Sequence, residues 1–186
     1  MLINLNFVLL LLAPLAAKAG VPAGLYKVFC KRGVVKEQSY LNGQVALKEM
    51  FFKDAACTQS YLTFETRGEV EYEENFAQNI NFTYKKIFLT LENHDLVENF
   101  NSRKVCGFSD WQINQKSEIT GLDCAIFNSD TASKIPSEGE MRYGIYLLKD
   151  NRLYYGKMSP QFDSSTREKR PESFDLSTEY IFQNPL

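Results

Sequence analysis

Few residues of this chain have the type and spacing that catalysis requires. The only histidine, His94, stands beside Asp95, so any Ser-His-Asp or Cys-His arrangement must use it. It opens a predicted surface helix, where a histidine is most simply solvated, and no serine or cysteine lies in a nucleophile motif. The sequence also lacks a glycine-rich phosphate loop. We therefore expect no enzyme and no cofactor.

An acidic run offers the other candidate for catalysis. Glu71, Glu73 and Glu74 are close enough in sequence to suggest the paired carboxylates of a glycoside hydrolase. Strand alternation, however, puts Val70 and Tyr72 on one face, and Glu71 and Glu73 on the other. Acidic residues on the outer face of a strand usually serve solubility, which is the interpretation we prefer.

The N-terminal residues 1–19 differ from the rest of the chain. Residues 7–12 are all apolar, and the segment ends at Ala17-Lys18-Ala19, an A-x-A cleavage pattern. The apolar run is about half the roughly 20 residues that a bilayer span needs, although no Lys or Arg precedes it as in most signal peptides. We expect a cleaved signal peptide at 1–19 and one secreted or periplasmic domain at 20–186, with no membrane span.

Four cysteines follow the predicted cleavage site. An even number in an exported chain indicates two disulfides, although sequence alone allows three connectivities. We expect Cys30 to pair with Cys57 and Cys106 with Cys124. The alternative is a zinc site, but the spacings are wide, there is no C-x-x-C pair and there is one histidine, so we expect no metal.

Composition and charge narrow the class of protein. The 186 residues suffice for one domain with a core, and 44% hydrophobic with 24% charged residues is typical of a globular protein. A net charge of -2 without a Lys/Arg stripe argues against a nucleic-acid partner. The 13% aromatic content favours strands over a helical bundle.

Short β-branched and aromatic runs separated by turn residues predict a mostly antiparallel β fold. A hairpin is expected around Arg67 and Gly68, and turns at Asn42-Gly43 and Asp150-Asn151. A short helix is expected at 93–103, and loops at 128–139 and 157–172. No strand is predicted in the polar stretch between the first two predicted strands, 24–30 and 44–52. The predicted strands are residues 24–30, 44–52, 61–66, 69–76, 79–91, one or two within 116–127, then 141–149, 152–156 and 179–182.

Three segments carry a resemblance to a known family. Gly24-Leu25-Tyr26 resembles the Gly-x-Trp start of lipocalins, with Tyr in place of Trp. Residues 52–58, Phe-Lys-Asp-Ala-Ala-Cys-Thr, resemble the aromatic-x-Asp-x-x-Cys-Thr segment of the domain in the adenomatosis-polyposis-coli-down-regulated family. Residues 153–156, Leu-Tyr-Tyr-Gly, followed by Arg170-Pro171, are similar to two further elements of that domain.

About eight to ten predicted strands, joined mostly by short turns, favour an all-β fold with a minor helix, either an up-and-down antiparallel barrel or a sandwich. The resemblance implies the first of these, an antiparallel lipocalin-like β-barrel. It also implies an apolar ligand bound outside the cell, and an arginine, here Arg170, packed over the aromatic residue of the first strand, here Tyr26. Ser60 departs from the family pattern, which has Pro there. We also expect one domain without an anchor, where the animal family has two domains and an anchor, so signalling roles are not implied.

The predicted function is to hold a hydrophobic small molecule or lipid in the barrel. An eight-stranded barrel holds one small ligand or is filled by side chains, and buried tyrosine hydroxyls, which need partners, favour a pocket. The alternative is a filled barrel whose loops bind another protein. The residues expected to line the pocket are Tyr26, Phe51, Phe64, Tyr72, Phe82, Tyr84, Tyr143, Ile145 and Tyr155.

Two further residues have open interpretations. Trp111, the only tryptophan, is either a structural plug near a disulfide or a contact residue on an exposed loop, and we favour the plug. Asn81-Phe82-Thr83 fits a glycosylation sequon but lies within a predicted strand.

Overall fold

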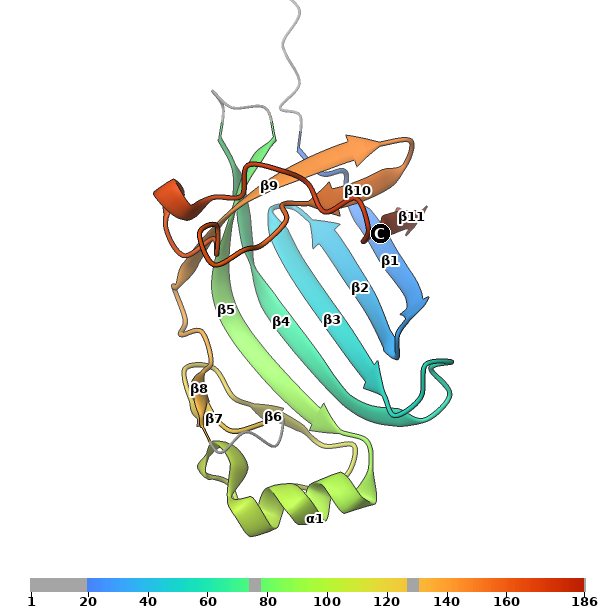
Figure 1. Ribbon diagram of the computed structural model, residues 1–186, viewed down its shortest axis with the longest axis vertical. Helices are drawn as coiled ribbons and strands as arrows, with labels where there is room; N and C mark the ends of the chain where they lie inside the picture. Colours follow the sequence, from blue (N-terminus) through green and yellow to red (C-terminus); the bar gives the residue numbers. More distant parts are fainter. Residues whose placement is uncertain (1–19, 74–77, 127–130, 186) are drawn as a thin grey trace, which may run out of the picture.

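The computed structural model describes residues 20–73, 78–126 and 131–185. The predicted signal peptide and the predicted strand end at Phe76 lie outside the described residues. The fold is mostly β with one short α-helix, as the sequence predicts (Figure 1). The expected all-β barrel is confirmed by the way the strands pair.

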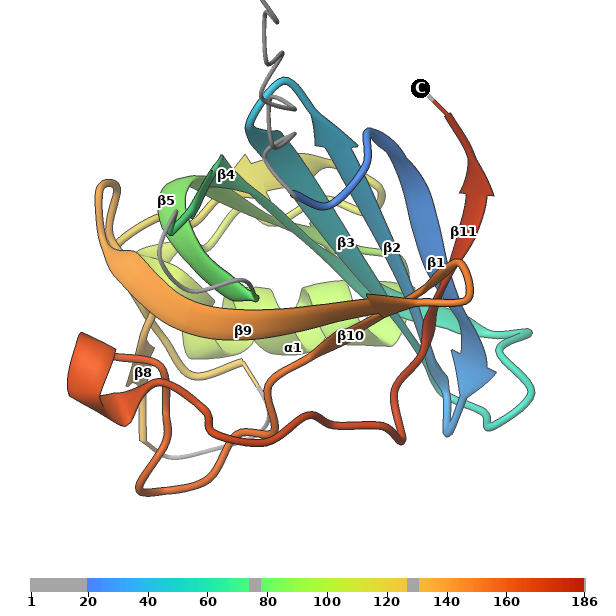
Figure 2. The same ribbon diagram turned by 90° about the horizontal axis from the view of Figure 1, so that it is seen from above.

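Eight strands form a closed ring. The strands follow the order β4-β3-β2-β1-β11-β10-β9-β5, and pairing of β4 with β5 closes the ring. Viewed from above, β9 and β10 cross the ring opposite β2 and β3 (Figure 2). The ring strands are β1 (Gly24–Lys31), β2 (Val34–Leu41), β3 (Gln44–Phe52), β4 (Ser60–Tyr72), β5 (Asn79–Leu91), β9 (Met141–Lys149), β10 (Arg152–Tyr155) and β11 (Tyr180–Asn184).

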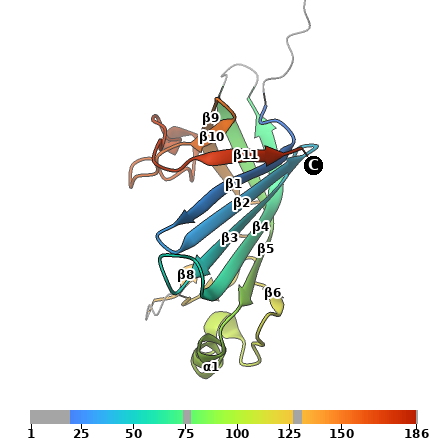
Figure 3. The same cartoon turned by 90° about the vertical axis from the view of Figure 1, so that its right-hand side faces the viewer.

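The long strand β5 changes partner along its free edge. Its first half pairs with β9, and its last residues pair with β6 (Lys116–Glu118). The helix α1 (His94–Arg103) therefore lies at the end of the molecule remote from β9, β10 and β11 (Figure 3). Two short strands, β7 (Asp123–Cys124) and β8 (Ser133–Lys134), pair beside it, and single 3-10 turns occupy Val105–Gly107 and Arg167–Lys169.

Three hairpins share one turn geometry. Asn42-Gly43 and Asp150-Asn151 form the predicted two-residue turns, with positive φ at both positions as in type I′ turns. Arg32-Gly33 forms a third turn of the same kind, between β1 and β2. Arg is uncommon at positive φ, so the sequence did not indicate this turn or the strand after it.

The predicted hairpin at Arg67-Gly68 is wrong. Both residues lie inside the continuous strand β4, and the chain reverses after Tyr72 instead. A Cβ on Gly68 would lie 2.3 Å from the Thr83 carbonyl oxygen, so glycine is needed here because β5 approaches closely at a bulge.

Two cores flank the middle of the barrel. The upper core lies among β1, β2, β5, β9 and β10, with Tyr26 and Leu153 at 1% and 0% exposure. The lower core packs strands β4 and β5 against α1, whose Phe100 is fully buried. Asn93 caps this helix by accepting a hydrogen bond from the Leu96 amide at 3.2 Å.

Trp111 belongs to the lower core. Its side chain is 4% exposed, its Nε1 donates to the Val105 carbonyl at 3.1 Å, and its ring meets Phe100 edge to face. The Cys106–Cys124 disulfide joins the same cluster. The residue is thus the structural plug that the sequence suggested.

Both predicted disulfides are present. Cys30 bonds to Cys57 and ties β1 to the β3-β4 connection, and Cys106 bonds to Cys124. Disulfides persist in oxidising compartments, so the pairing indicates an extracellular type of environment. Within the described ranges, no helix has the length and apolar character needed to cross a bilayer.

Candidate functional site

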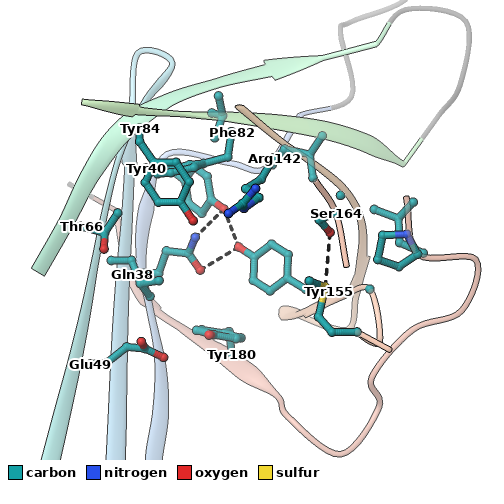
Figure 4. Close-up of a pocket in the computed structure, with 18 residues that line it drawn as sticks. Gln38, Tyr40, Glu49, Thr66, Phe82, Tyr84, Arg142, Tyr155, Ser164 and Tyr180 are labelled. Atoms are coloured by element: carbon teal, nitrogen blue, oxygen red, sulfur yellow. Dashed lines mark hydrogen bonds between the residues drawn. The ribbon is translucent and has the colours of Figure 1, made fainter. Parts of the chain in front are cut away.

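A pocket of about 410 Å³ lies within the ring, and residues of the upper core, among them Tyr40, Val70, Ile80 and Tyr180, line it. Its volume is near the lower end of the range of about 300–1,000 Å³ that small-molecule sites occupy. The residues that line it come from seven of the eight ring strands, all but β1, and from the segment after β10 (Figure 4). The strand residues are Gln38, Tyr40, Leu47, Glu49, Thr66, Val70, Ile80, Phe82, Tyr84, Arg142, Gly144, Ile145, Tyr155 and Tyr180.

A closed cycle of hydrogen bonds forms one wall of the pocket. Gln38 Nε2 donates to the Tyr40 hydroxyl at 2.9 Å, and the Tyr155 hydroxyl donates to Gln38 Oε1 at 2.7 Å. Because the Tyr155 proton is used in that bond, the short contact between the two hydroxyls has Tyr40 as the donor. Each group thus has a partner without any ligand (Figure 4). The tyrosine hydroxyls therefore do not by themselves require a ligand, contrary to the argument from sequence.

Burial makes these tyrosines weak acids. Loss of solvation raises the pKa of Tyr40 and of Tyr155 well above the ordinary value, and it raises that of Tyr180 as well. All three remain neutral donors and acceptors at physiological pH. The wall is therefore polar but uncharged.

Charged groups enter the pocket as pairs. On the inward face of β2 and β3, Lys36 is the cross-strand neighbour of Glu49, with Nζ and Oε1 2.5 Å apart. Arg142 lies 2.8 Å from Glu140 and has its guanidinium 5.9 Å from the centre of the Tyr84 ring. Glu49 and Arg142, which line the pocket, are therefore each neutralised by a partner of opposite charge.

The segment 156–175, which we call the strap, completes the pocket. Met158, Ser164 and Pro171 line it, and Ser164 donates a hydrogen bond to the Met158 sulfur at 3.3 Å. Pro171 packs against Gly156 so closely that a Cβ on Gly156 would lie 2.4 Å from it. The Leu-Tyr-Tyr-Gly and Arg-Pro elements of the sequence thus meet in space.

Arg170 fastens the strap to the barrel. Its guanidinium donates to Glu73 Oε1 at 2.6 Å, to Asn81 Oδ1 at 3.0 Å and to the Gly144 carbonyl at 2.6 Å. The ring of Tyr143 lies 5.7 Å from the same guanidinium. The expected packing of Arg170 over Tyr26 is wrong, because the strap crosses β9 and meets the β4-β5 end, not β1.

Glu73 is part of this cluster and not a solubilising surface residue, which corrects the interpretation from sequence. It accepts hydrogen bonds from Asn79 at 2.9 Å and from Asn81 at 3.2 Å in addition to the bond from Arg170. These bonds, that from Asn79 foremost, hold the pKa of the Glu73 carboxyl below its usual range. Asn81 is 4% exposed, so the folded chain does not present the sequon to a glycosylating enzyme.

The nine predicted lining residues separate into groups. Phe82, Tyr84, Ile145 and Tyr155 line the pocket. The other five do not: Tyr26 and Tyr72 pack in the upper core, Phe51 and Phe64 meet edge to face beside the lower core, and Tyr143 lies under Arg170.

Sequence reasoning missed much of the lining. Gln38 and Tyr40 lie on β2, which was not predicted as a strand. Leu47 and Val70 share strand faces with the predicted residues Phe51 and Tyr72, but they were not named as lining residues. The Asn42-Gly43 turn could have revealed β2, because a two-residue hairpin turn requires a strand before it as well as after it.

His94, the candidate for catalysis, lies away from the pocket. His94 is exposed at the start of α1, and within the described part of the chain no three His, Cys, Asp or Glu side chains gather as metal ligands. Neither a protein-family model nor a curated protein matches this chain.

Proposed function

We propose that this chain is an exported, lipocalin-like binding protein that holds a hydrophobic small molecule or lipid group in its barrel. The observation that supports this most is the pocket of about 410 Å³ inside a closed eight-stranded ring. Barrels of this size hold one small ligand when side chains do not fill them.

The character of the walls supports an apolar ligand. Leu47, Val70, Ile80 and Phe82 present hydrocarbon to the pocket, while the polar side chains of Gln38, Tyr40 and Tyr155 already bond to one another. A ligand that is mainly apolar can therefore enter without leaving buried donors or acceptors unpaired. This favours a carrier or scavenger of apolar molecules.

Export and family relationship belong to the same proposal. Two disulfides agree with an oxidising compartment, and cleavage of residues 1–19 would deliver the chain to the periplasm or extracellular space. The segments that resemble the adenomatosis-polyposis-coli-down-regulated family also make structural contacts. Gly156 of one segment packs against Pro171 of another, and Cys57 of the third forms a disulfide.

Titration with N-phenyl-1-naphthylamine, a neutral apolar probe whose fluorescence rises on transfer from water, tests the proposal. We expect saturable binding of one probe per chain. Thr66 lines the pocket, so Thr66→Phe would fill part of it and weaken binding at least about tenfold, which equals about 1.4 kcal/mol. The control is Thr90→Phe on β5. Leu89 and Leu91 on either side of Thr90 point into the lower core, so by strand alternation Thr90 faces the other way, and it does not line the pocket.

Failure of the parent to bind the probe would contradict the carrier proposal and favour the protein-interaction alternative. Equal weakening by Thr66→Phe and Thr90→Phe would show that the probe binds elsewhere. Both variants keep the strand propensity of the site, since Phe is a good strand former.

A further inference from the structure

A second hollow adjoins the pocket on the inward face of the first three strands. It has a volume of about 270 Å³ and an apolar floor made by Val28, Val34 and Phe51. Glu49 lines both hollows, so they are neighbours along one face of the sheet. An elongated molecule that entered the pocket could extend one end past Glu49 into this second hollow.

The second hollow carries excess positive charge. Its charged lining residues are Lys31, Arg32 and Lys36 against the single carboxylate of Glu49. Lys36 pairs with Glu49. Lys31 donates to the Ser177 carbonyl and interacts electrostatically with Asp175, so Arg32 is the cation that these two carboxylates leave unmatched. A concave, partly apolar site with excess charge of one sign concentrates ions of the opposite sign.

Arg32 is the group best placed to bind an anion. It is exposed in the turn between β1 and β2, and it makes no hydrogen bond or ion pair with the residues that the structure describes. Its planar guanidinium matches a carboxylate or phosphate with two parallel hydrogen bonds. By contrast, the charges in the pocket itself, Glu49 and Arg142, already have partners.

We infer that the ligand is a single-chain amphiphile with an anionic headgroup. The apolar chain occupies the pocket, and the headgroup binds at Arg32 and Lys31 in the second hollow. This inference rests on the proposed function and adds to it the charge of the ligand and the place of its headgroup.

Equilibrium dialysis of the disulfide-bonded protein against labelled palmitate, hexadecyl phosphate and hexadecanol tests the inference. The three probes share a sixteen-carbon chain, so differences in affinity report the headgroup. We expect the two anionic probes to bind about three- to tenfold more tightly than hexadecanol, the modest gain of a solvent-exposed ion pair, and 0.5 M salt to remove most of this difference. Comparing palmitate with hexadecyl phosphate distinguishes a carboxylate from a phosphate as the natural headgroup.

Arg32→Asn is the decisive variant. Asn-Gly is the preferred sequence of a type I′ turn, so this change removes the charge and keeps the turn. It should weaken binding of the anionic probes about three- to tenfold and leave hexadecanol unchanged. Arg32→Lys keeps the charge but loses the planar guanidinium, so its loss should be smaller, and the remote Lys134→Asn should behave like the parent.

The outcomes separate the two proposals. Equal affinity for all three probes, unchanged by Arg32→Asn, would overturn the anionic headgroup and leave the carrier proposal intact. Absence of binding by all three probes would overturn both.

Discussion

Replacing Arg170 with Met removes the side chain that fastens the strap and keeps most of its apolar volume. Arg170 and Glu73 are 12% and 19% exposed, so their ion pair is largely shielded from water. The change deletes three hydrogen bonds and leaves the Gly144 carbonyl and Asn81 Oδ1 without their donor. Breaking a fully buried ion pair costs about 3–5 kcal/mol, but Glu73 keeps two amide donors and some access to water. We therefore expect a loss of about 2–3 kcal/mol in the free energy of unfolding.

Thermal unfolding followed by circular dichroism measures this loss. For a chain of this length, about 2–3 kcal/mol lowers Tm by roughly 5–10 °C. Arg167 lies 3.9 Å from Glu73 but is 67% exposed, so the matched control Arg167→Met should cost less than about 0.5 kcal/mol. In a double-mutant cycle with Glu73→Gln, the effects of Arg170→Met and Glu73→Gln should fall short of additivity by at least about 1 kcal/mol. A Tm for Arg170→Met within 2 °C of the parent (roughly 0.5 kcal/mol), or additive effects, would refute the reasoning.

Three further predictions follow from the same contacts. Tyr155→Phe removes the donor to buried Gln38 Oε1 and should cost about 1–3 kcal/mol in urea unfolding, and a smaller loss would show that water replaces the hydroxyl. The pKa of Glu73 is lower in the folded chain than its value of 4.5 in the unfolded chain. The ionised carboxylate therefore stabilises the fold above pH 4.5, and this contribution is lost as the pH falls through the folded-state pKa. The parent should therefore lose Tm between about pH 5 and pH 3 more steeply than Glu73→Gln, and parallel curves would count against this. Replacing Cys106 and Cys124 together with Ala should cost about 2–4 kcal/mol, and an unchanged urea midpoint would show that the bridge contributes nothing.

Local sequence signals predicted most of the strands and both disulfides. Strands β1, β3, β5 and β9 follow their β-branched and aromatic runs, and helix α1 follows its capping residue Asn93 and its apolar spacing. These features depend on short-range physics, namely capping, turn preference and alternation, which a single sequence displays. The even number of cysteines predicted two disulfides, but the sequence alone did not decide among the three connectivities.

Strand β2 was missed because its inward face is polar. Lys36 and Gln38 point into the barrel, where alternation would place apolar residues. A sequence breaks local rules most often at functional sites, and here the break coincides with the pocket and the second hollow. The failed prediction thus marks the site more clearly than the successful ones do.

Gly68 shows a second limit of sequence reasoning. Arg67-Gly68 has the composition of a turn, yet the glycine accommodates the close approach of Thr83 and Phe82 on β5. Turn formation and close backbone approach both require glycine, and only the tertiary arrangement distinguishes them. The same dependence on tertiary arrangement explains why Tyr26, which is buried, and Tyr72, which is partly buried, pack in the upper core without lining the pocket.

The most direct test of the carrier proposal is native mass spectrometry of the disulfide-bonded protein, purified without extraction by organic solvent. We expect one bound apolar ligand per chain, its loss on solvent extraction, and uptake of one palmitate by the emptied protein. Thr66→Phe should take up little palmitate and Thr90→Phe as much as the parent. A protein that is isolated bare and takes up neither palmitate nor hexadecanol would contradict the account.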